Sequence, residues 1–228
     1  AMPRDTGLAF IVVQQAVRGR PSMTIESLAT HTPMPVTQIS SGVAPAPNTV
    51  HVVPSGFHLS LEEGVLTLKD SDEDDRLHSP IDLVFRSLAE DQGSKTYAIV
   101  LSGTGGDGTI GIEAVKSAGG VTLAQLSEST RFADMPNNAA ETGLIDFKLT
   151  LKDIPGKLLE LEKWRRQTPL SKSHSLNQSI EAQLPEILDQ VDCSGDSCFH
   201  HYKPGTLTRR ILRRMMLRHI SRVDEYID

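Results

Sequence analysis

The sequence predicts an α/β fold, a three-layer sandwich in which helices cover both faces of a mostly parallel, doubly wound sheet, followed by a small all-α C-terminal segment. Two apolar runs of strand length, 8–13 and 98–101, lack polar alternation, which is typical of strands covered on both faces. Helix-like stretches lie between and after them, and such alternation is typical of a parallel sheet. At 228 residues, 38% of them hydrophobic, the chain can bury one sizeable core and a second small module.

The other elements of the first module follow from the same periodicities. Residues 81–89 predict a helix because Ile81, Val84 and Phe85 recur at three- and four-residue intervals. Glu63-Gly64 lies between two alternating runs and predicts a hairpin turn. In chain order, we expect a strand at 8–13, a helix at 22–31, a strand at 50–53, a hairpin at 57–68, a helix at 81–89, a strand at 98–101, a helix at 110–118 and a strand at 121–124.

The last third of the chain has a different composition. Serines among polar neighbours at 167–179 predict a linker, and two helical stretches follow at 180–191 and 206–220 with no strand between them. The last segment is too short to complete a stable domain alone. We therefore expect an α/β domain at 1–163, a linker at 164–180 and a helical segment at 181–228.

Composition and charge exclude several classes of protein. No stretch approaches the roughly 18 apolar residues that cross a bilayer, and the first residues lack the order of a secretory signal. We therefore expect a cytoplasmic protein without a transmembrane segment. The formal net charge of −6 argues against nucleic acid as a partner. Cys193 and Cys198, without an ordered set of histidines, predict reduced thiols, and we expect neither a metal nor a cofactor.

The stretch SGTGGDG, residues 102–108, lies where a buried strand gives way to a helix. In an open α/β sheet, ligands and catalytic groups gather at the carboxyl ends of strands. Glycines there permit unusual backbone angles and expose N–H groups to an oxyanion, and Asp107 would face the same crevice. Two other interpretations stay open from the residue types: a tight turn in which Asp107 caps the following helix, and an anion-binding loop built on Gly105 and Gly106.

Five segments within residues 3–162 resemble, in the same order, the catalytic domain of the CheB family, the chemotaxis-receptor protein-glutamate methylesterases. They read DTGLAFIVVQQ, LATHTPMPV, APNTVHVVPSGFHLSL, SPIDLVFRSLAEDQG and VLSGTGGDGTIGIEAVKSAGGVTLAQLSESTRFADMPNNAAETGLID. Residues 181–228 are similar to the N-terminal helical subdomain of the CheR receptor methyltransferases. The combined order is similar to CheB–CheR fusion proteins, which implies a role in chemosensory signal transduction.

The CheB family uses a serine nucleophile, a histidine base and an aspartate that orients the histidine. By position, Asp107 matches the aspartate, and Thr104 matches a residue whose backbone N–H contributes to the oxyanion hole. The histidine position holds Gln15, whose amide cannot accept a proton near neutral pH. The G-A-S-x-G-G turn that carries the serine has no counterpart in this sequence. The resemblance therefore implies an inactive esterase domain or, alternatively, an active esterase truncated at its N-terminus.

In the family, the strand that precedes the serine turn lies inside the sheet. Its absence would expose rows of N–H and C=O groups on the neighbouring strands. We therefore expect either self-association through those edges or a closer approach of the two neighbours. Met135, in a Met-Pro pair that resembles the family's G-M-P turn near the active-site rim, is expected to help shape the cleft, and an ordinary loop is the alternative.

The expected helix at 206–220 has two faces, with apolar residues on one and arginines on the other. The arginines are Arg209, Arg210, Arg213 and Arg214. In the CheR family a matching basic helix engages the acidic helices of receptors. The resemblance therefore implies a chemoreceptor or another acidic helical protein as the partner, and a solvated charged face is the alternative.

Overall fold

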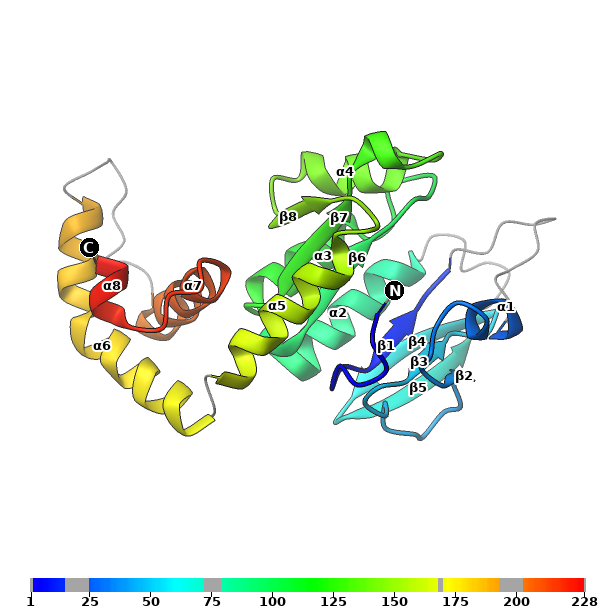
Figure 1. Ribbon diagram of the computed structural model, residues 1–228, viewed down its shortest axis with the longest axis horizontal. Coiled ribbons are helices and arrows are strands. Elements are labelled where there is room, and N and C mark those ends of the chain that lie inside the picture. Colours follow the sequence, from blue (N-terminus) through cyan, green and yellow to red (C-terminus); the bar gives the residue numbers. More distant parts are fainter. Residues whose placement is uncertain (1, 15–24, 72–78, 168–169, 193–202, 228) are drawn as a thin grey trace. The chain divides into compact units, whose positions relative to one another are not determined.

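The structure, a computed structural model, describes residues 2–14, 25–71, 79–167, 170–192 and 203–227 (Figure 1). The chain divides into two compact units, 1–155 and 156–228. The boundary lies before the predicted end of the first domain at residue 163. Among the described helices, none combines the length and the apolar character needed to cross a bilayer.

The first unit alternates strands and helices, as the sequence predicts. In chain order its elements are β1 (Phe10–Val12), α1 (Ile25–Ala29), β2 (Val36–Gln38), β3 (Val50–Val52), β4 (Phe57–Glu62), β5 (Val65–Asp70), α2 (Pro80–Gln92), β6 (Tyr97–Val100), α3 (Thr109–Ser117), β7 (Val121–Gln125), α4 (Asp134–Glu141) and β8 (Phe147–Leu149). Two short 3-10 helices, Gly93–Lys95 and Ser127–Ser129, lie before β6 and after β7.

The parallel strands form two three-stranded sheets, ordered β1-β3-β2 and β6-β7-β8. In these sheets β1 pairs with β3, and β6 pairs with β7, in parallel register. Strands β4 and β5 form an antiparallel hairpin whose turn residues Glu63 and Gly64 have φ of 51° and 77°, the sign that a two-residue hairpin turn requires. The prediction of an α/β fold with mostly parallel strands and one hairpin is confirmed.

Helix α2 joins two parts of the hydrophobic core. Its Ile81 and Phe85 lie in one buried cluster with Val100 of β6. Its Val84 lies in a second cluster with Leu59 of β4. The apolar stripe that predicted this helix is therefore wide enough to hold the β6 sheet on one side and the hairpin on the other.

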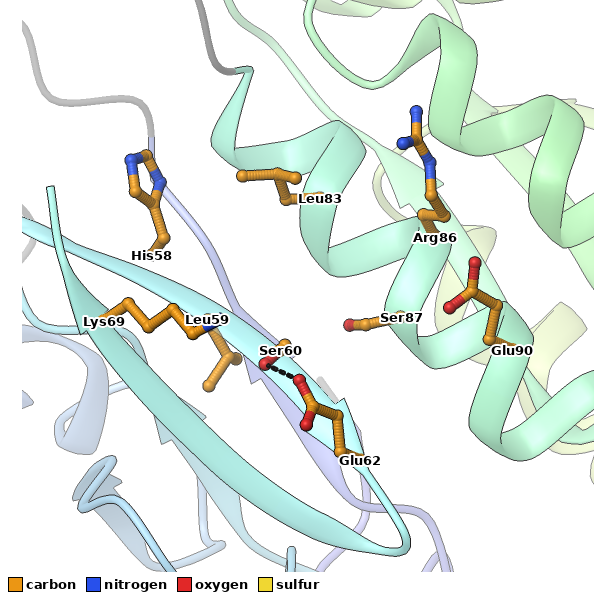
Figure 2. Close-up of a pocket in the computed structure, with 9 residues that line it drawn as sticks. All are labelled: His58, Leu59, Ser60, Glu62, Lys69, Leu83, Arg86, Ser87 and Glu90. Carbon is orange, nitrogen blue, oxygen red and sulfur yellow. Dashed lines mark hydrogen bonds between the residues drawn. The ribbon is translucent and has the colours of Figure 1, made fainter. Parts of the chain in front are cut away.

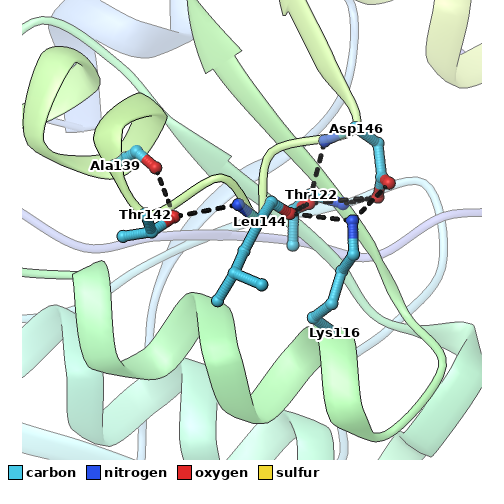
Figure 3. Close-up of polar contacts among 6 residues, drawn as sticks. All are labelled: Lys116, Thr122, Ala139, Thr142, Leu144 and Asp146. Atoms are coloured by element: carbon cyan, nitrogen blue, oxygen red, sulfur yellow. Dashed lines mark hydrogen bonds and ion pairs between the residues drawn. The ribbon is translucent and has the colours of Figure 1, made fainter. Parts of the chain in front are cut away.

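Strand β7 is buried along its whole length, which requires partners for its polar groups. The Thr122 hydroxyl donates to the Leu144 carbonyl oxygen at 2.6 Å, and the Thr122 N–H donates to Asp146 Oδ2 at 2.9 Å (Figure 3). Lys116 Nζ of α3 lies 2.7 Å from Asp146 Oδ1 and donates to the Leu144 carbonyl oxygen at 3.0 Å. This network ties α3 and the chain that enters β8 to β7.

Three short elements, β2, α4 and β8, were not predicted from the sequence. The alternative of an ordinary loop at Met135 is wrong, because Met135 and Pro136 lie in the first turn of α4. A proline in the first turn removes no intrahelical hydrogen bond. Met135 and Ala139 pack into the same buried cluster as Phe85. This burial favours a helix where the sequence shows no long apolar period.

The second unit contains α5 (Ile154–Gln167, of which 156–167 belong to it), α6 (Leu170–Asp192), α7 (Pro204–Leu217) and α8 (Val223–Ile227). Most of the predicted linker at 164–180 is therefore helical. Serines are tolerated in α6 because its apolar residues are buried against α7 and α8. The buried residues of this cluster are Leu176, Ile180, Leu184, Ile187, Leu207, Ile211, Met215 and Val223.

Candidate active-site region at the glycine loop

Residues 102–108, called the glycine loop below, carry the chain from β6 into α3. Gly105 and Gly108 have φ of 88° and 96°, in the left-handed region that favours glycine. A Cβ at Gly108 would lie 3.1 Å from Cγ2 of Ile81 in α2. The expectation that these glycines permit unusual backbone angles is confirmed at these two positions, and Gly108 also allows the loop to approach α2.

The glycine loop is held against the segment that leads into α4. The Gly103 N–H donates to the Phe132 carbonyl oxygen at 3.0 Å, and the Met135 N–H donates to the Gly103 carbonyl oxygen at 3.1 Å. Asn138 Nδ2 donates to the Gly105 carbonyl oxygen at 2.8 Å. A Cβ at Gly103 would lie 2.1 Å from the Met135 sulfur, so the buried Met135 side chain occupies the space that glycine leaves. Met135 therefore packs directly against the glycine loop at Gly103.

The middle of the glycine loop presents backbone donors to solvent. Thr104, Gly105 and Gly106 are exposed. Among the residues that the structure describes, the N–H groups of these three residues donate to no protein acceptor. Adjacent unpaired N–H groups are the arrangement that stabilises an oxyanion or binds a small anion.

Asp107 is buried, with 6% of its surface exposed, and its carboxylate caps a helix. Oδ2 accepts the N–H of Ile81 at 3.1 Å and Oδ1 accepts the N–H of Asp82 at 3.0 Å. These donors belong to α2, so the alternative in which Asp107 caps the following helix is wrong. Burial raises the pKa of Asp107 above its usual range, the N–H donors of Ile81, Asp82 and Gly108 oppose this shift, and the nearby Asp82 carboxylate adds to it.

Gln15 lies outside the described residues, so its distance from Asp107 is not part of this structure. Val13 is described and packs against the buried cluster that contains Val100 and Met135. Gln15 follows Val13 by two residues.

A pocket of about 250 Å³ lies between the β4–β5 hairpin and α2, apart from the glycine loop (Figure 2). Its walls are formed by positively and negatively charged side chains together with two serines and two leucines. The lining residues are His58, Leu59, Ser60, Glu62, Lys69, Leu83, Arg86, Ser87 and Glu90. None of the site residues predicted from the sequence lines this pocket, and its mixed charge favours no single class of ligand.

The second unit carries the predicted basic face on α7. Arg209, Arg210 and Arg214 are exposed and Arg213 is half-buried, whereas Ile211 and other apolar residues of the helix are buried. The Arg214 guanidinium lies 5.9 Å from the centre of the Tyr226 ring, and Arg209 Nε donates to its own helix at Gly205. The two-faced helix is as expected.

Metal-ligating side chains form no cluster of three or more in the described part of the chain. Cys193 and Cys198, which the sequence predicts to be reduced thiols, lie outside the described residues.

Comparison with known proteins identifies the first unit. The sequence profile of the family described as CheB methylesterase matches residues 1–158, nearly the same range as the first compact unit. The chain belongs to the CheB methylesterase family. The crystal structure of the Thermotoga maritima CheB methylesterase catalytic domain is similar, with 31% sequence identity, a TM-score of 0.63, and coverage of 70% of this chain and 87% of that one.

Two curated relatives are longer proteins that this chain matches in part. A protein-glutamate methylesterase/protein-glutamine glutaminase of Anaeromyxobacter dehalogenans is 32% identical over 162 residues, 71% of this chain and 48% of that protein. An uncharacterized 104.1 kDa protein of Rhodobacter capsulatus is 36% identical over 222 residues, 88% of this chain and 23% of that protein. The chain thus spans from about a quarter to about half of these relatives.

The structure adds site residues that the sequence did not reveal. Asp82, Asn138 and Gln125 all hydrogen-bond to the glycine loop or to the start of α3. Asp82 makes two of these four hydrogen bonds, to partners 25 and 29 residues away in the chain. The bonds of Asn138 and Gln125 join residues that are 33 and 23 positions apart. Spacing within one element therefore carried no signal for these contacts.

Proposed function

We propose that the CheB domain of this protein binds the methylated, glutamate-bearing helices of a chemoreceptor but does not hydrolyse their methyl esters. The observation that carries the proposal is Gln15 at the position where the family has its histidine base, with Asp107 retained. A serine hydroxyl becomes a useful nucleophile only when an adjacent imidazole removes its proton. An amide accepts no proton near pH 7, so the base step is missing whatever supplies the serine.

The geometry of the glycine loop supports a role in binding. Thr104, Gly105 and Gly106 are exposed, and their N–H groups, which donate to no acceptor in the described part of the chain, provide hydrogen-bond donors for a carbonyl or carboxylate oxygen of a ligand. The buried carboxylate of Asp107 lies at the end of the same loop, where the family has the aspartate of its triad. The domain would then serve as a binding or scaffold module of a chemosensory protein in the cytoplasm.

Methanol release from a methylated receptor tests this proposal. The assay should use the full-length gene product, so that any upstream residues are included. We expect no release above the buffer control from the natural sequence, together with measurable binding of the receptor. Gln15→His should restore release if the gene product carries the nucleophile, and Asp107→Asn in the Gln15→His background should abolish it. Methanol release by the natural sequence would support the alternative of an active esterase.

An anion-binding scaffold is the second candidate, favoured by the same exposed N–H groups. Titration with phosphate, followed through the backbone amide shifts of Gly105, Gly106 and Gly108, distinguishes the two. Shifts that saturate at these three amides with phosphate alone would favour the anion-binding function. Shifts that appear with receptor helices and not with phosphate would favour the chemoreceptor function.

We further propose that the helices of residues 181–228 form a CheR-type segment whose basic face docks an acidic helical partner. The exposed guanidinium groups of α7 supply the positive charge. Arg209→Glu combined with Arg210→Glu should weaken binding of an acidic receptor helix and reduce its salt dependence. Arg222→Glu, which lies outside α7 and removes an exposed pair with Asp224 at 2.9 Å, is the matched control. Equal loss of binding in the control would argue against this face.

The edges of the two parallel sheets suggest self-association. Strands β1 and β6 each lie at the end of their sheet in the described part of the chain. An unpaired strand edge is a template for pairing with another chain. Sedimentation velocity over a range of concentrations should show a reversible dimer, and a single monomeric species throughout would contradict this proposal.

A further inference from the structure

We propose that Asp82, in the first turn of α2, is a positioning residue that holds the Asp107 carboxylate in one orientation. The role of Asp107 as the partner of position 15 rests on the proposed function above, but the hydrogen bonds that support this inference do not depend on position 15. The two aspartates cap each other's helices. The Asp107 side chain caps α2, which contains Asp82, and the Asp82 side chain caps α3, which follows Asp107 in the chain.

Helix α2 has no cap of its own. Ser79 lies at the N-cap position with extended backbone, and its side chain makes no capping hydrogen bond. The first N–H groups of a helix have no partner within the helix and need an acceptor. Asp107 supplies both of its oxygens to the N–H groups of Ile81 and Asp82, the second and third residues of α2. The cap of α2 therefore comes from the glycine loop.

Helix α3 also begins without a capping side chain. Its N-cap residue is Gly108, in the left-handed conformation. The missing acceptor comes from α2, because Asp82 Oδ1 accepts the N–H of Gly111, the third residue of α3, at 2.7 Å. Asp82 is buried with 6% of its surface exposed, so water cannot readily replace this bond.

Close backbone packing fixes the distance between the two caps. A Cβ at Gly111 would lie 2.6 Å from Phe85 Cβ and 3.0 Å from Asp82 Cα. Glycine therefore allows α3 to contact the α2 backbone directly at the turn that carries Asp82. Neither helix can rotate or slide without breaking a cap of the other.

Asp82 thus holds Asp107 in two ways. Its own N–H binds Asp107 Oδ1, and its carboxylate fixes the start of α3, the helix that follows Asp107 in the chain. The N–H donors of Ile81 and Asp82, one on each Asp107 oxygen, hold the plane of the carboxylate in a fixed orientation. A fixed carboxylate is what a triad needs to orient an imidazole, and what an amide at the same position would contact.

Hydrogen exchange of the Ile81 amide and the NMR titration of the Asp107 carboxyl carbon test the role of Asp82. In Asp82→Ala, exchange at Ile81, measured relative to the most protected amides, should accelerate roughly tenfold, because the Asp107 cap loosens when its support is lost. Asp82→Asn keeps the acceptor for Gly111 and should restore protection at Ile81. It should also lower the pKa of Asp107, because a nearby negative charge is gone.

The matched control is Asp146→Ala, which removes a comparably buried carboxylate at the Lys116 network and should leave relative exchange at Ile81 unchanged. Unchanged protection of Ile81 in Asp82→Ala would overturn the proposal, since the two caps would then be independent. If Asp82→Ala does not fold, Asp82→Glu keeps the charge but displaces the carboxylate, and should accelerate exchange at both Ile81 and Gly111. No change at either amide in Asp82→Glu would also overturn it. None of these readouts involves residue 15, so failure here is distinguishable from failure of the proposed function.

Discussion

Asp107 and Asp82 are two buried carboxylates that cap each other's helices, and backbone N–H groups balance their charge. Asp107 accepts two N–H groups of α2, and Asp82 accepts one of α3. Among the described residues neither forms an ion pair. Burial of like charges close together is unfavourable unless hydrogen bonds compensate. The pair therefore links the stability of the domain to the ionisation of Asp107.

The pH dependence of unfolding should reveal this link. Because the pKa of Asp107 is raised in the folded state, the folded protein binds this proton more tightly than the unfolded chain does. The resulting stabilisation is present at low pH and is lost as pH rises through the folded pKa, beginning above about pH 4. Asp107→Asn should remove this component. Urea unfolding of both proteins between about pH 3 and about pH 8 measures this pH-dependent part of the free energy of unfolding. The range is wide enough to cover a raised aspartate pKa.

The same variant also removes a hydrogen-bond acceptor. Ionised Asp107 offers two acceptor oxygens and Asn offers one, so an N–H of Ile81 or Asp82 loses its partner, at a cost of about 1–3 kcal/mol. Asp107→Asn should be less stable than the natural sequence, and the difference should narrow as pH rises, because the natural protein then loses the stabilisation that comes from the raised pKa of Asp107. A constant difference across the range would show that Asp107 does not titrate abnormally.

Substitution of Gly103 should disturb the contact between the glycine loop and α4. A Cβ at this position would overlap the Met135 sulfur at 2.1 Å, so Gly103→Ala should lower the free energy of unfolding by about 1–3 kcal/mol. Gly106→Ala is the matched control, since its Cβ would meet Asn138 Nδ2 at 3.5 Å, an ordinary contact. Thermal unfolding of both variants measures the difference. If steric overlap is the cause, adding Met135→Ala should make Gly103→Ala cost less than it does alone.

Two helical glycines should respond to alanine in opposite directions. Gly111→Ala should destabilise the protein, because its Cβ would lie 2.6 Å from Phe85 Cβ. Gly156→Ala in α5 meets nothing within 4 Å and should stabilise its helix by roughly 0.5–1 kcal/mol through propensity. Chemical denaturation measures both changes. Stabilisation by Gly111→Ala would contradict the close contact of α2 with α3.

The network at Asp146 predicts unequal costs for its two charged members. Asp146→Ala removes the acceptor of the buried Thr122 N–H and leaves Lys116 without its ion pair, so we expect a loss of about 3 kcal/mol or more. The Lys116 side chain is 26% exposed, and Lys116→Met should cost less because water can solvate part of the site. Urea unfolding compares the two. Equal costs would show that the ion pair dominates and that the Thr122 hydrogen bond contributes little.

Local patterns predicted β1, β3, β6, β7, the hairpin and the helices α2, α3 and α7, because those signals lie within a few residues of each other. The Glu63-Gly64 turn and the apolar stripe of α2 are examples. Helix α4 was missed because its eight residues carry no long apolar period, and burial of Met135 and Ala139 against other elements stabilises it. The serine-rich stretch predicted as a linker is helical for a similar reason.

The sequence alone determined that Asp107 lies in a glycine-rich turn at the end of a buried strand, and that position 15 holds an amide. Only the tertiary structure decided which helix Asp107 caps, and that the Asp82 carboxylate in turn caps the start of α3. Chemical identity is a local property of the chain, whereas a cap supplied from 25 residues away depends on how two helices pack.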